Sequence, residues 1–225
     1  MPRWWNKSLM QEVEQTAELV QCTPDVNRML ERIARVCYNS EDRMACDCPD
    51  GYCGNCRTRR DKFLGGLKER RHDSVFEHAI ATFRLVTDRG ITHEFVRHRL
   101  ASYTQSSTRY IKYAGGLPVV RPLFVSPMEE GAWRRAMLAA EAAYGELLAA
   151  GVPTQNARDV LPTCTAATLF VTANFRQWRH ILKLRLAEEA HPKIRALAKL
   201  IWEKLSPLCP AYFADLYDED TLRSI

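Results

Sequence analysis

The residues most able to do chemistry in this chain are concentrated between Arg97 and Tyr110, in the segment RHRLASYTQSSTRY. Three arginines, one histidine, one glutamine and three serines lie within these fourteen residues. The arginine guanidinium is a planar group of donors that matches phosphate oxygens bidentately and stays charged at any working pH. Serine hydroxyls and a glutamine amide add neutral donors and acceptors. The segment therefore suits an anionic, oxygen-rich ligand such as a nucleotide, although an arginine-rich helix end can equally be a solvated face.

A second group of reactive side chains is a cysteine cluster, Cys46, Cys48, Cys53 and Cys56. In a chain without an apparent secretory signal, clustered cysteines are more typical of metal ligands than of a disulfide framework. Four thiolates in a glycine-containing loop could surround Zn²⁺ tetrahedrally or hold a [4Fe–4S] cluster, and the spacing does not decide between them. Unliganded or reactive thiols are the remaining alternative. The four scattered cysteines are expected to be small buried apolar residues.

The composition is that of a globular protein of one substantial domain or two small ones. The 225 residues are 46% hydrophobic and 26% charged, with a formal net charge of +5. The N-terminal residues lack the continuous apolar stretch of a secretory signal, and no apolar run approaches the ~20 residues of a membrane span. We expect a cytoplasmic protein that binds anionic small molecules, with no membrane or nucleic acid as partner.

Alternating and capped segments predict the elements that position the arginine-rich segment. Residues 79 to 87 alternate, which predicts a strand with Ala81, Phe83 and Leu85 on its covered face. A short helix carrying Glu94, Arg97, His98 and Arg99 should follow, so that the segment begins on a helix and ends in a loop. Further strands are expected at residues 118 to 125 and 163 to 173.

Helices are predicted around these strands. Residues 8 to 39 show helical spacing, with Met29, Ile33, Val36 and Cys37 on one buried face. The loop from Asp47 to Thr58 interrupts that pattern, and the basic residues from Arg57 to Lys62 after it are expected to be a solvated face. Ser126 to Glu129 form a capping box for a helix whose apolar stripe runs from Trp133 to Leu147. Asn174 should cap a helix that carries His180, Leu184 and Arg185, and Pro192 should begin the final helix.

The order of motifs resembles that of the flavin-dependent thymidylate synthases. Arg97-His98-Arg99 followed seven residues later by Ser107 is similar to the family signature. The segment from His72 to His78 resembles its His-x-Ser/Thr-x-x-Glu-His motif. Further matching segments are Ala34–Tyr38, Ala157–Pro162, Thr172–Arg176, His180 and Leu184–Arg185. The resemblance covers the chain from about residue 30 onward, except for a cysteine-rich insertion at about residues 43 to 62.

The resemblance implies an α+β fold, an antiparallel sheet packed with helices, in a single domain over residues 1 to 225. It implies conversion of dUMP to dTMP, with methylene tetrahydrofolate as carbon donor and NADPH-reduced FAD as reductant, in a homotetramer with shared active sites. The residues implied for FAD are Ser74, Arg97, His98, Arg99, Gln105, Asn174, Phe175, Arg176 and His180. Those implied for dUMP are Glu94, Phe95, Val96, Arg97, Gln105, Ser106, Ser107, Thr108, Arg109, Arg158 and Arg185.

Within that set, Arg185 is the implied catalytic residue, since a fixed cation beside the pyrimidine would stabilise its developing negative charge. Ser107 and Arg109 suit the phosphate end. Glu77 and His78 could either cap the strand that follows or contact FAD and hold the arginines. The competing interpretation of the whole chain is a nucleic-acid-binding module built on the four-cysteine cluster and its basic flank, which leaves residues 72 to 185 unexplained.

Overall fold

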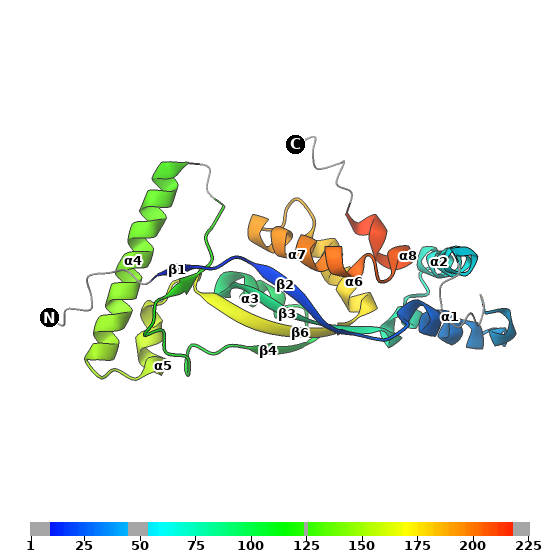
Figure 1. Cartoon of the computed structure of the whole chain (residues 1–225), viewed down its shortest axis with the longest axis horizontal. Coiled ribbons are helices and arrows are strands. Elements are labelled where there is room, and N and C mark those ends of the chain that lie inside the picture. The colour runs from blue at the N-terminus through cyan, green and yellow to red at the C-terminus, as the bar shows by residue number, and fades with distance from the viewer. Residues whose placement is uncertain (1–9, 45–53, 124–125, 218–225) are drawn as a thin grey trace. The chain divides into compact units, whose positions relative to one another are not determined.

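A sheet of antiparallel strands is present in the computed structural model, which describes residues 10–44, 54–123 and 126–217. Four strands are ordered β2 (Thr16–Cys22), β3 (Ile80–Asp88), β6 (Ala166–Asn174) and β4 (Ser102–Gln105). The amide of Phe175 donates to the Ala79 carbonyl, and that of Arg89 to the Thr165 carbonyl, so β3 and β6 run in opposite directions. The expected antiparallel sheet is thus confirmed (Figure 1).

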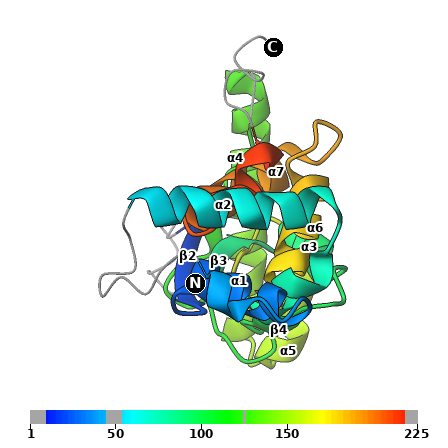
Figure 2. The ribbon, with the colours of Figure 1, turned by 90° about the vertical axis from the view of Figure 1, so that its right-hand side faces the viewer.

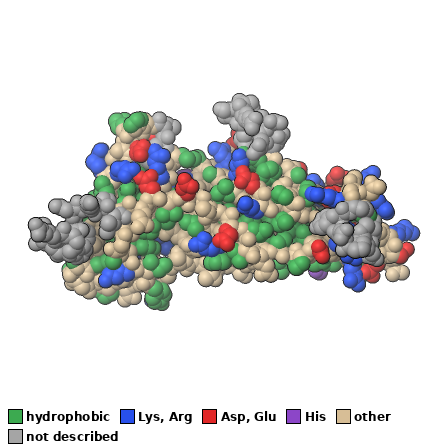
Figure 3. Space-filling model, viewed as in Figure 1, with side chains coloured by type: hydrophobic (Ala, Val, Ile, Leu, Met, Phe, Trp, Pro, Cys, Tyr) green, Lys and Arg blue, Asp and Glu red, His purple; other side chains and the backbone are tan. Residues whose placement is uncertain are grey.

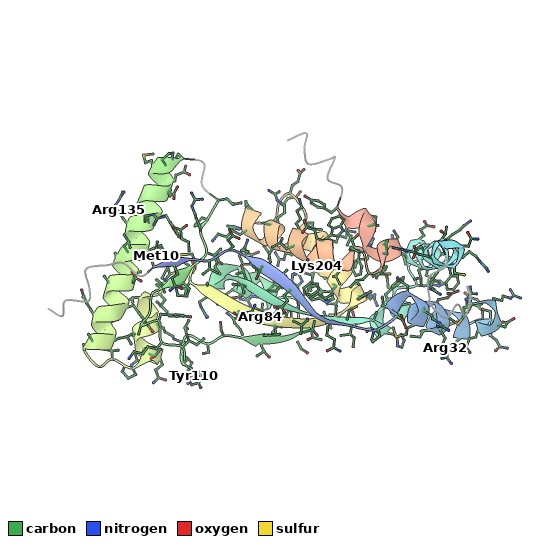
Figure 4. The ribbon with its side chains drawn as sticks, in the orientation of Figure 1. Met10, Arg32, Arg84, Tyr110, Arg135 and Lys204 are labelled. Carbon is green, nitrogen blue, oxygen red and sulfur yellow. The ribbon has the colours of Figure 1, made fainter. Side chains whose placement is uncertain are left out.

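The predicted alternation of β3 is also confirmed. Ala81, Phe83 and Leu85 are fully buried, whereas Arg84 on the other face pairs with Glu18 of β2 at 3.6 Å (Figure 4). β6 shows the same pattern. Each strand therefore turns one face to a helical layer, as period-two sequences require.

The described residues group into two compact units. Of the described residues, unit 1 comprises 10–16, 85–98, 103–123 and 126–170, and unit 2 comprises 17–44, 54–84, 99–102 and 171–217. The assignment of the chain to a single domain stays a prediction.

Unit 1 contains α3 (Arg89–Phe95), α4 (Pro127–Ala149), α5 (Thr154–Ala157) and the 3₁₀ turn η4 (Arg158–Val160). Its short strands β1 (Gln11–Glu12) and β5 (Pro118–Val119) pair in parallel. Met137 of α4 packs in an apolar cluster with Leu117, Val119 and Cys164. Figure 1 shows α4 beside β1 and α5. The strand expected over residues 118–125 is limited to β5 within the described residues.

Unit 2 contains α1 (Val26–Val36), α2 (Gly54–Glu69), α6 (Phe175–Arg185), α7 (Pro192–Leu205) and α8 (Pro210–Phe213). Its 3₁₀ turns are η2 (Glu41–Arg43), η3 (Asp73–His78) and η5 (Ala214–Leu216). Figure 2 shows α1 and α2 side by side. Trp178 of α6 is fully buried, and its indole N–H donates to the Ala81 carbonyl at 3.0 Å.

Local capping signals were predicted correctly. The Ser126 hydroxyl accepts from the Glu129 amide and begins α4, with Pro127 at its first position. The Asn174 side chain accepts from the Gln177 amide and begins α6. These side-chain oxygens satisfy amides that have no partner inside the helix.

Four predictions about the elements were wrong. Residues 8–39 are not one helical pattern, because β1 and β2 precede α1, and Val36 and Cys37 are exposed. Helix α2 already begins at Gly54, inside the loop expected to reach Thr58. Helix α3 ends at Phe95, so Arg97 to Arg99 follow it instead of lying on it. α7 is not the final helix, because α8 follows it.

Some surface charges of unit 1 are paired beside α4. Arg121 pairs with Glu130 at 2.6 Å, and Arg134 pairs with Glu12 at 2.5 Å. Figure 3 shows basic and acidic side chains interspersed over α4. Within residues 10–44, 54–123 and 126–217, none of the helices has the length and apolarity to cross a membrane.

Candidate functional site

Unit 2 contains a pocket of about 380 Å³ at the junction of α1, α2, η3 and α6. Helix α1 and the turn after it supply one wall, the end of α2 and η3 supply a second, and the first turn of α6 supplies a third. The pocket is lined by Ala34, Cys37, Tyr38, Leu67, Arg71, His72, Asp73, Ser74, Val75 and Arg176. Two residues predicted for FAD, Ser74 and Arg176, come together here from segments about 100 residues apart in the sequence.

The turn η3, which carries Ser74, is held from beneath by an aromatic residue of α8. The ring of Tyr212 stacks on Phe76 with centroids 3.6 Å apart and an interplanar angle of 7°. The Tyr212 hydroxyl donates to Asp73 Oδ1 at 3.0 Å. Burial, reinforced by the adjacent Asp73 carboxylate, raises the pKa of Tyr212, so the phenol remains a protonated donor.

Arg176 is oriented by an acidic partner from η3. Its guanidinium donates to the Glu77 carboxylate, and this hydrogen bond raises the pKa of Arg176. Of the two roles that the sequence left open for Glu77, holding an arginine agrees with this geometry. A held guanidinium loses less side-chain entropy when a ligand binds.

The remaining predicted residues of unit 2 lie on or beside α6. Asn174 uses Oδ1 for the helix cap at 2.8 Å, which leaves its amide N–H₂ as a donor. His180 is exposed, and Arg185 lies half-buried in the last turn. Phe175 is fully buried against Phe213, with ring centroids 5.1 Å apart, so its side chain belongs to the core.

In unit 1, the segment after α3 is fixed by a half-buried tyrosine. The Tyr103 hydroxyl lies 2.9 Å from the Phe95 carbonyl oxygen and 2.8 Å from that of His98, and can donate its proton to either. Burial raises the pKa of Tyr103 to about 12. Phe95 and His98 are buried, whereas Arg97 is exposed. The segment therefore presents the Arg97 guanidinium to solvent from an anchored backbone.

Strand β4 and the turn after it hold several hydroxyl and amide groups in place. Gln105 Nε2 donates to Thr92 Oγ1 at 2.9 Å. Ser106 Oγ accepts from the Thr168 amide at 3.0 Å, and Ser107 Oγ accepts from the Arg109 amide at 3.3 Å. Because these contacts use the serine oxygens as acceptors, the hydroxyl protons of both serines can still be donated to an anion.

Around this turn, the cationic and apolar candidates differ in exposure. Arg109 is exposed, with its guanidinium 5.4 Å from the centre of the Tyr110 ring, and that ring is itself 76% exposed (Figure 4). Thr108 is buried. Arg158, on η4, is half-buried and lies 3.9 Å from Asp159. Glu94 and Val96 are also half-buried.

The predicted residues divide between the units. Unit 1 contains every residue implied for dUMP except Arg185. Unit 2 contains Arg185, and it also contains six of the residues implied for FAD, which are Ser74, Arg99, Asn174, Phe175, Arg176 and His180. Arg97, His98 and Gln105, which were also implied for FAD, belong to unit 1.

The predicted metal ligands are only partly covered. Cys46, Cys48 and Cys53 lie outside the described residues, whereas Cys56 is buried in the first turn of α2. Among the residues that the structure describes, no group of three or more histidine, cysteine or acidic side chains could hold a metal ion. Cys209 is buried, and desolvation raises the pKa of its thiol to about 12, which makes it a poor nucleophile.

Sequence reasoning missed a buried ionic cluster that joins α1 to α2. Glu31 has no exposed surface and accepts from Arg60 at 3.0 Å and from Arg35 at 2.9 Å. Arg60 was expected on a solvated face, and that expectation was wrong because the guanidinium is buried against Glu31. Tyr212 was missed as well, since nothing in its local sequence indicates a partner 139 positions away.

Comparisons with known proteins agree over most of the chain. The family model described as "Thymidylate synthase complementing protein" matches residues 18–211. The chain is 37% identical to a flavin-dependent thymidylate synthase of Geobacter sulfurreducens, over 88% of this chain and 84% of that protein. It is 39% identical to the enzyme of the same name from Mycobacterium tuberculosis, over 83% and 78%. A solved UMP/dUMP methylase, PolB from Streptomyces cacaoi, bound with 5-Br dUMP, superposes with a TM-score of 0.73 at 25% identity and covers 91% of this chain and 95% of that one.

Proposed function

Since the chain belongs to the flavin-dependent thymidylate synthase family, we propose that it converts dUMP to dTMP with methylene tetrahydrofolate as the carbon donor and NADPH-reduced FAD as the reductant. The observation that carries this assignment to individual residues is the pocket of unit 2. It combines Ser74 and Arg176, two FAD residues of the family motifs, in one concave site. The alternative of a nucleic-acid-binding module has no support, because the family match extends far beyond the cysteine cluster.

The donor set of the pocket fits part of FAD. The Ser74 hydroxyl and the Arg176 guanidinium are suited to phosphate oxygens, and Glu77 holds Arg176 in place. The Asn174 amide, at the N-cap of α6, and His180, on α6, would add polar contacts. When bound, the flavin supplies the redox chemistry, and the protein supplies orientation and electrostatics.

For dUMP, we assign the turn after β4 to the phosphate. The Ser107 hydroxyl proton and the exposed Arg109 guanidinium are donors on an anchored turn. Arg97 and Arg158 would add charge, and Gln105 would recognise a polar edge. Ser107 has a positioning role in this assignment, because its hydroxyl contacts the backbone amide of Arg109, which cannot act as a base.

Arg185 is the residue that we assign to catalysis. A guanidinium beside the pyrimidine would stabilise the negative charge that develops over N3 and C2 and would so make C5 more nucleophilic. Losing a fixed donor of this kind typically costs ~10²–10³ in rate. The last turn of a helix is a favourable place for this cation, since the helix dipole stabilises positive charge there.

The test has two steps. The purified protein should bind FAD and show the two absorbance bands of an oxidised flavin. Arg185→Ala should then abolish tritium release from dUMP labelled at C5 while FAD binding is retained. Lys183→Ala is the matched control, because it removes an exposed cation from the same helix turn. A protein that cannot be reconstituted with FAD would refute the assignment, and full activity of Arg185→Ala would refute the role of Arg185.

Two finer assignments are proposed on the sequence alone. The resemblance supports a homotetramer with shared active sites, which a molar mass measured by light scattering after size exclusion would check. The four clustered cysteines support a zinc or iron–sulfur site. Quantifying both metals in anaerobically purified protein and in Cys53→Ser tests this, and absence of both metals would refute it.

A further inference from the structure

Two residues after the end of α2, Arg71 adopts the left-handed backbone conformation at the edge of the pocket. Arg71 has φ = 58°. The His72 amide donates to the Leu67 carbonyl at 2.9 Å, and the Arg71 amide donates to the Lys68 carbonyl at 3.0 Å. These two bonds form a Schellman motif, in which the left-handed position is usually glycine because a Cβ is unfavourable there.

Arginine is an unusual residue at this position. The other non-glycine residues with positive φ in the described part of the chain are Asp25 and Asn39. Asp and Asn are the side chains that tolerate this conformation best, because their short polar groups bond to the local backbone. Arg71 has no such adaptation, so its presence here carries a conformational cost. Strained backbone of this kind is concentrated at ligand sites, where a function offsets the cost.

The surroundings of Arg71 point to an anionic ligand. The side chain lines the pocket together with His72, Ser74 and Arg176. Arg176 is already paired with Glu77, and the Asp73 carboxylate accepts from Tyr212. Among the described residues, none forms an ion pair or a hydrogen bond with the guanidinium of Arg71. Its N–H donors are therefore all available to a ligand in the pocket.

We propose that Arg71 is a further binding residue that contacts the diphosphate of an adenine dinucleotide in this pocket. The inference rests on the proposed function, which supplies two such ligands, FAD and NADPH. The pocket volume of about 380 Å³ is at the small end of ligand pockets, which span about 300–1,000 Å³, so it accommodates part of a dinucleotide rather than the whole. Arg71 is not among the residues that the family motifs assign to either molecule.

The test uses Arg71→Gly in the full-length protein, because this substitution separates binding from folding. Glycine relieves the left-handed strain, so Tm should stay unchanged or rise by up to about 4 °C. The Kd for FAD, measured by fluorescence titration of the apoprotein, should rise about tenfold, as expected for one lost charge-assisted hydrogen bond. A rise instead in the NADPH concentration that half-saturates flavin reduction would identify NADPH as the ligand.

Two control variants test whether the effect depends on the position and on the charge of Arg71. Arg70→Ala removes the same charge from the neighbouring residue, which is exposed and does not line the pocket, and it should leave both constants near wild type. Arg71→Lys retains the charge and should fall between wild type and Arg71→Gly. Wild-type constants for both dinucleotides in Arg71→Gly, or an equal loss in Arg70→Ala, would overturn the inference while the proposed function stands. A wild-type protein that binds neither dinucleotide would overturn both.

Discussion

The Tyr212 hydroxyl is hydrogen-bonded to Asp73 Oδ1 at 3.0 Å, and so connects α8 to the turn that carries Ser74. The ring of Tyr212 stacks on Phe76 of the same turn. Arg179 lies 5.1 Å above that ring and forms a two-point ion pair with Asp215. The pocket wall formed by η3 is therefore supported by Tyr212, Arg179 and Asp215. None of these three residues lines the pocket.

Tyr212→Phe should test this support with minimal change in packing. The phenyl ring can keep its stacking on Phe76, whereas Asp73 loses its hydrogen-bond donor. We expect the free energy of unfolding to fall by about 1 kcal/mol, the usual net value of such a bond, and the affinity for FAD to fall modestly. Urea unfolding and FAD titration measure the two effects. Trp202→Phe is a control, because it removes a comparable hydrogen bond, from the indole to the Phe213 carbonyl, away from the pocket lining. Equal FAD affinities in wild type and Tyr212→Phe would show that the bond supports only the fold.

The free energy of unfolding at acid pH should show how much the ionised Asp215 side chain stabilises the fold. Hydrogen bonds from Arg179 lower the pKa of the Asp215 carboxyl from 3.8 to about 2. Partial burial opposes this shift, and Lys68 adds to it. The unfolded chain therefore takes up this proton at higher pH than the folded protein does. The stabilisation is complete above about pH 4 and is lost as the pH falls toward about 2. Since 44% of the Asp215 side chain is exposed, solvent screening reduces the effect.

The measurement is the change in unfolding free energy between about pH 6 and about pH 2.5. Asp215→Asn should lose less stability over this interval than wild type, because it has no proton to take up at this site. Asp159→Asn is the control, since that carboxylate is 82% exposed and 3.9 Å from its arginine. An acid-induced loss in Asp215→Asn as large as that of wild type would show that the Arg179 pair does not contribute.

The buried cluster of Glu31 with Arg35 and Arg60 should be sensitive to loss of its anion. Removing one partner of a buried pair leaves an uncompensated charge, which typically costs about 3–5 kcal/mol. Glu31→Ala should therefore be severely destabilised in thermal unfolding. Glu41→Ala breaks the exposed pair with Arg32, where the side chains are 47% and 72% exposed, and should cost at most about 1 kcal/mol. Similar losses in the two variants would contradict a buried role for Glu31.

Much of the fold was predictable because its signals are local. The alternation in β3 and the caps of α4 and α6 involve residues within a few positions of one another. The segment before α1 was misassigned because β2 depends on pairing with β3, for example through the Thr23 amide and the Ile80 carbonyl. The buried face of α1 also differs from the predicted one. It contains Val26, Leu30 and Ala34 together with Glu31. The burial of Glu31 depends on Arg60, which is 29 positions away and so leaves no signal in the local spacing.

In the candidate site, too, sequence motifs identified some residues, whereas residues whose role depends on a distant contact or a backbone angle were missed. Ser74 and Arg176 were identified through family motifs, and the structure brings both to one pocket. Arg71 was not identified, because its importance lies in a backbone angle that no residue pattern reveals. Tyr212 was not identified either, because its role depends on a contact with Asp73. Motifs thus identify candidate binding groups, whereas the residues that support them become visible only in three dimensions.

Asn174 offers a way to separate a structural role from a binding role in one residue. Its Oδ1 caps α6 by accepting from the Gln177 amide at 2.8 Å, whereas its amide N–H₂ is the group proposed to donate to FAD. Asn174→Asp keeps the capping oxygen and is favourable at a helix N-terminus, so stability should change by less than about 0.5 kcal/mol. The same change replaces a donor with an anionic acceptor, so the Kd for FAD should rise at least about tenfold. Asn174→Ala should lose FAD affinity together with about 1 kcal/mol of stability. Unchanged FAD binding in Asn174→Asp would mean that Asn174 serves the helix cap alone.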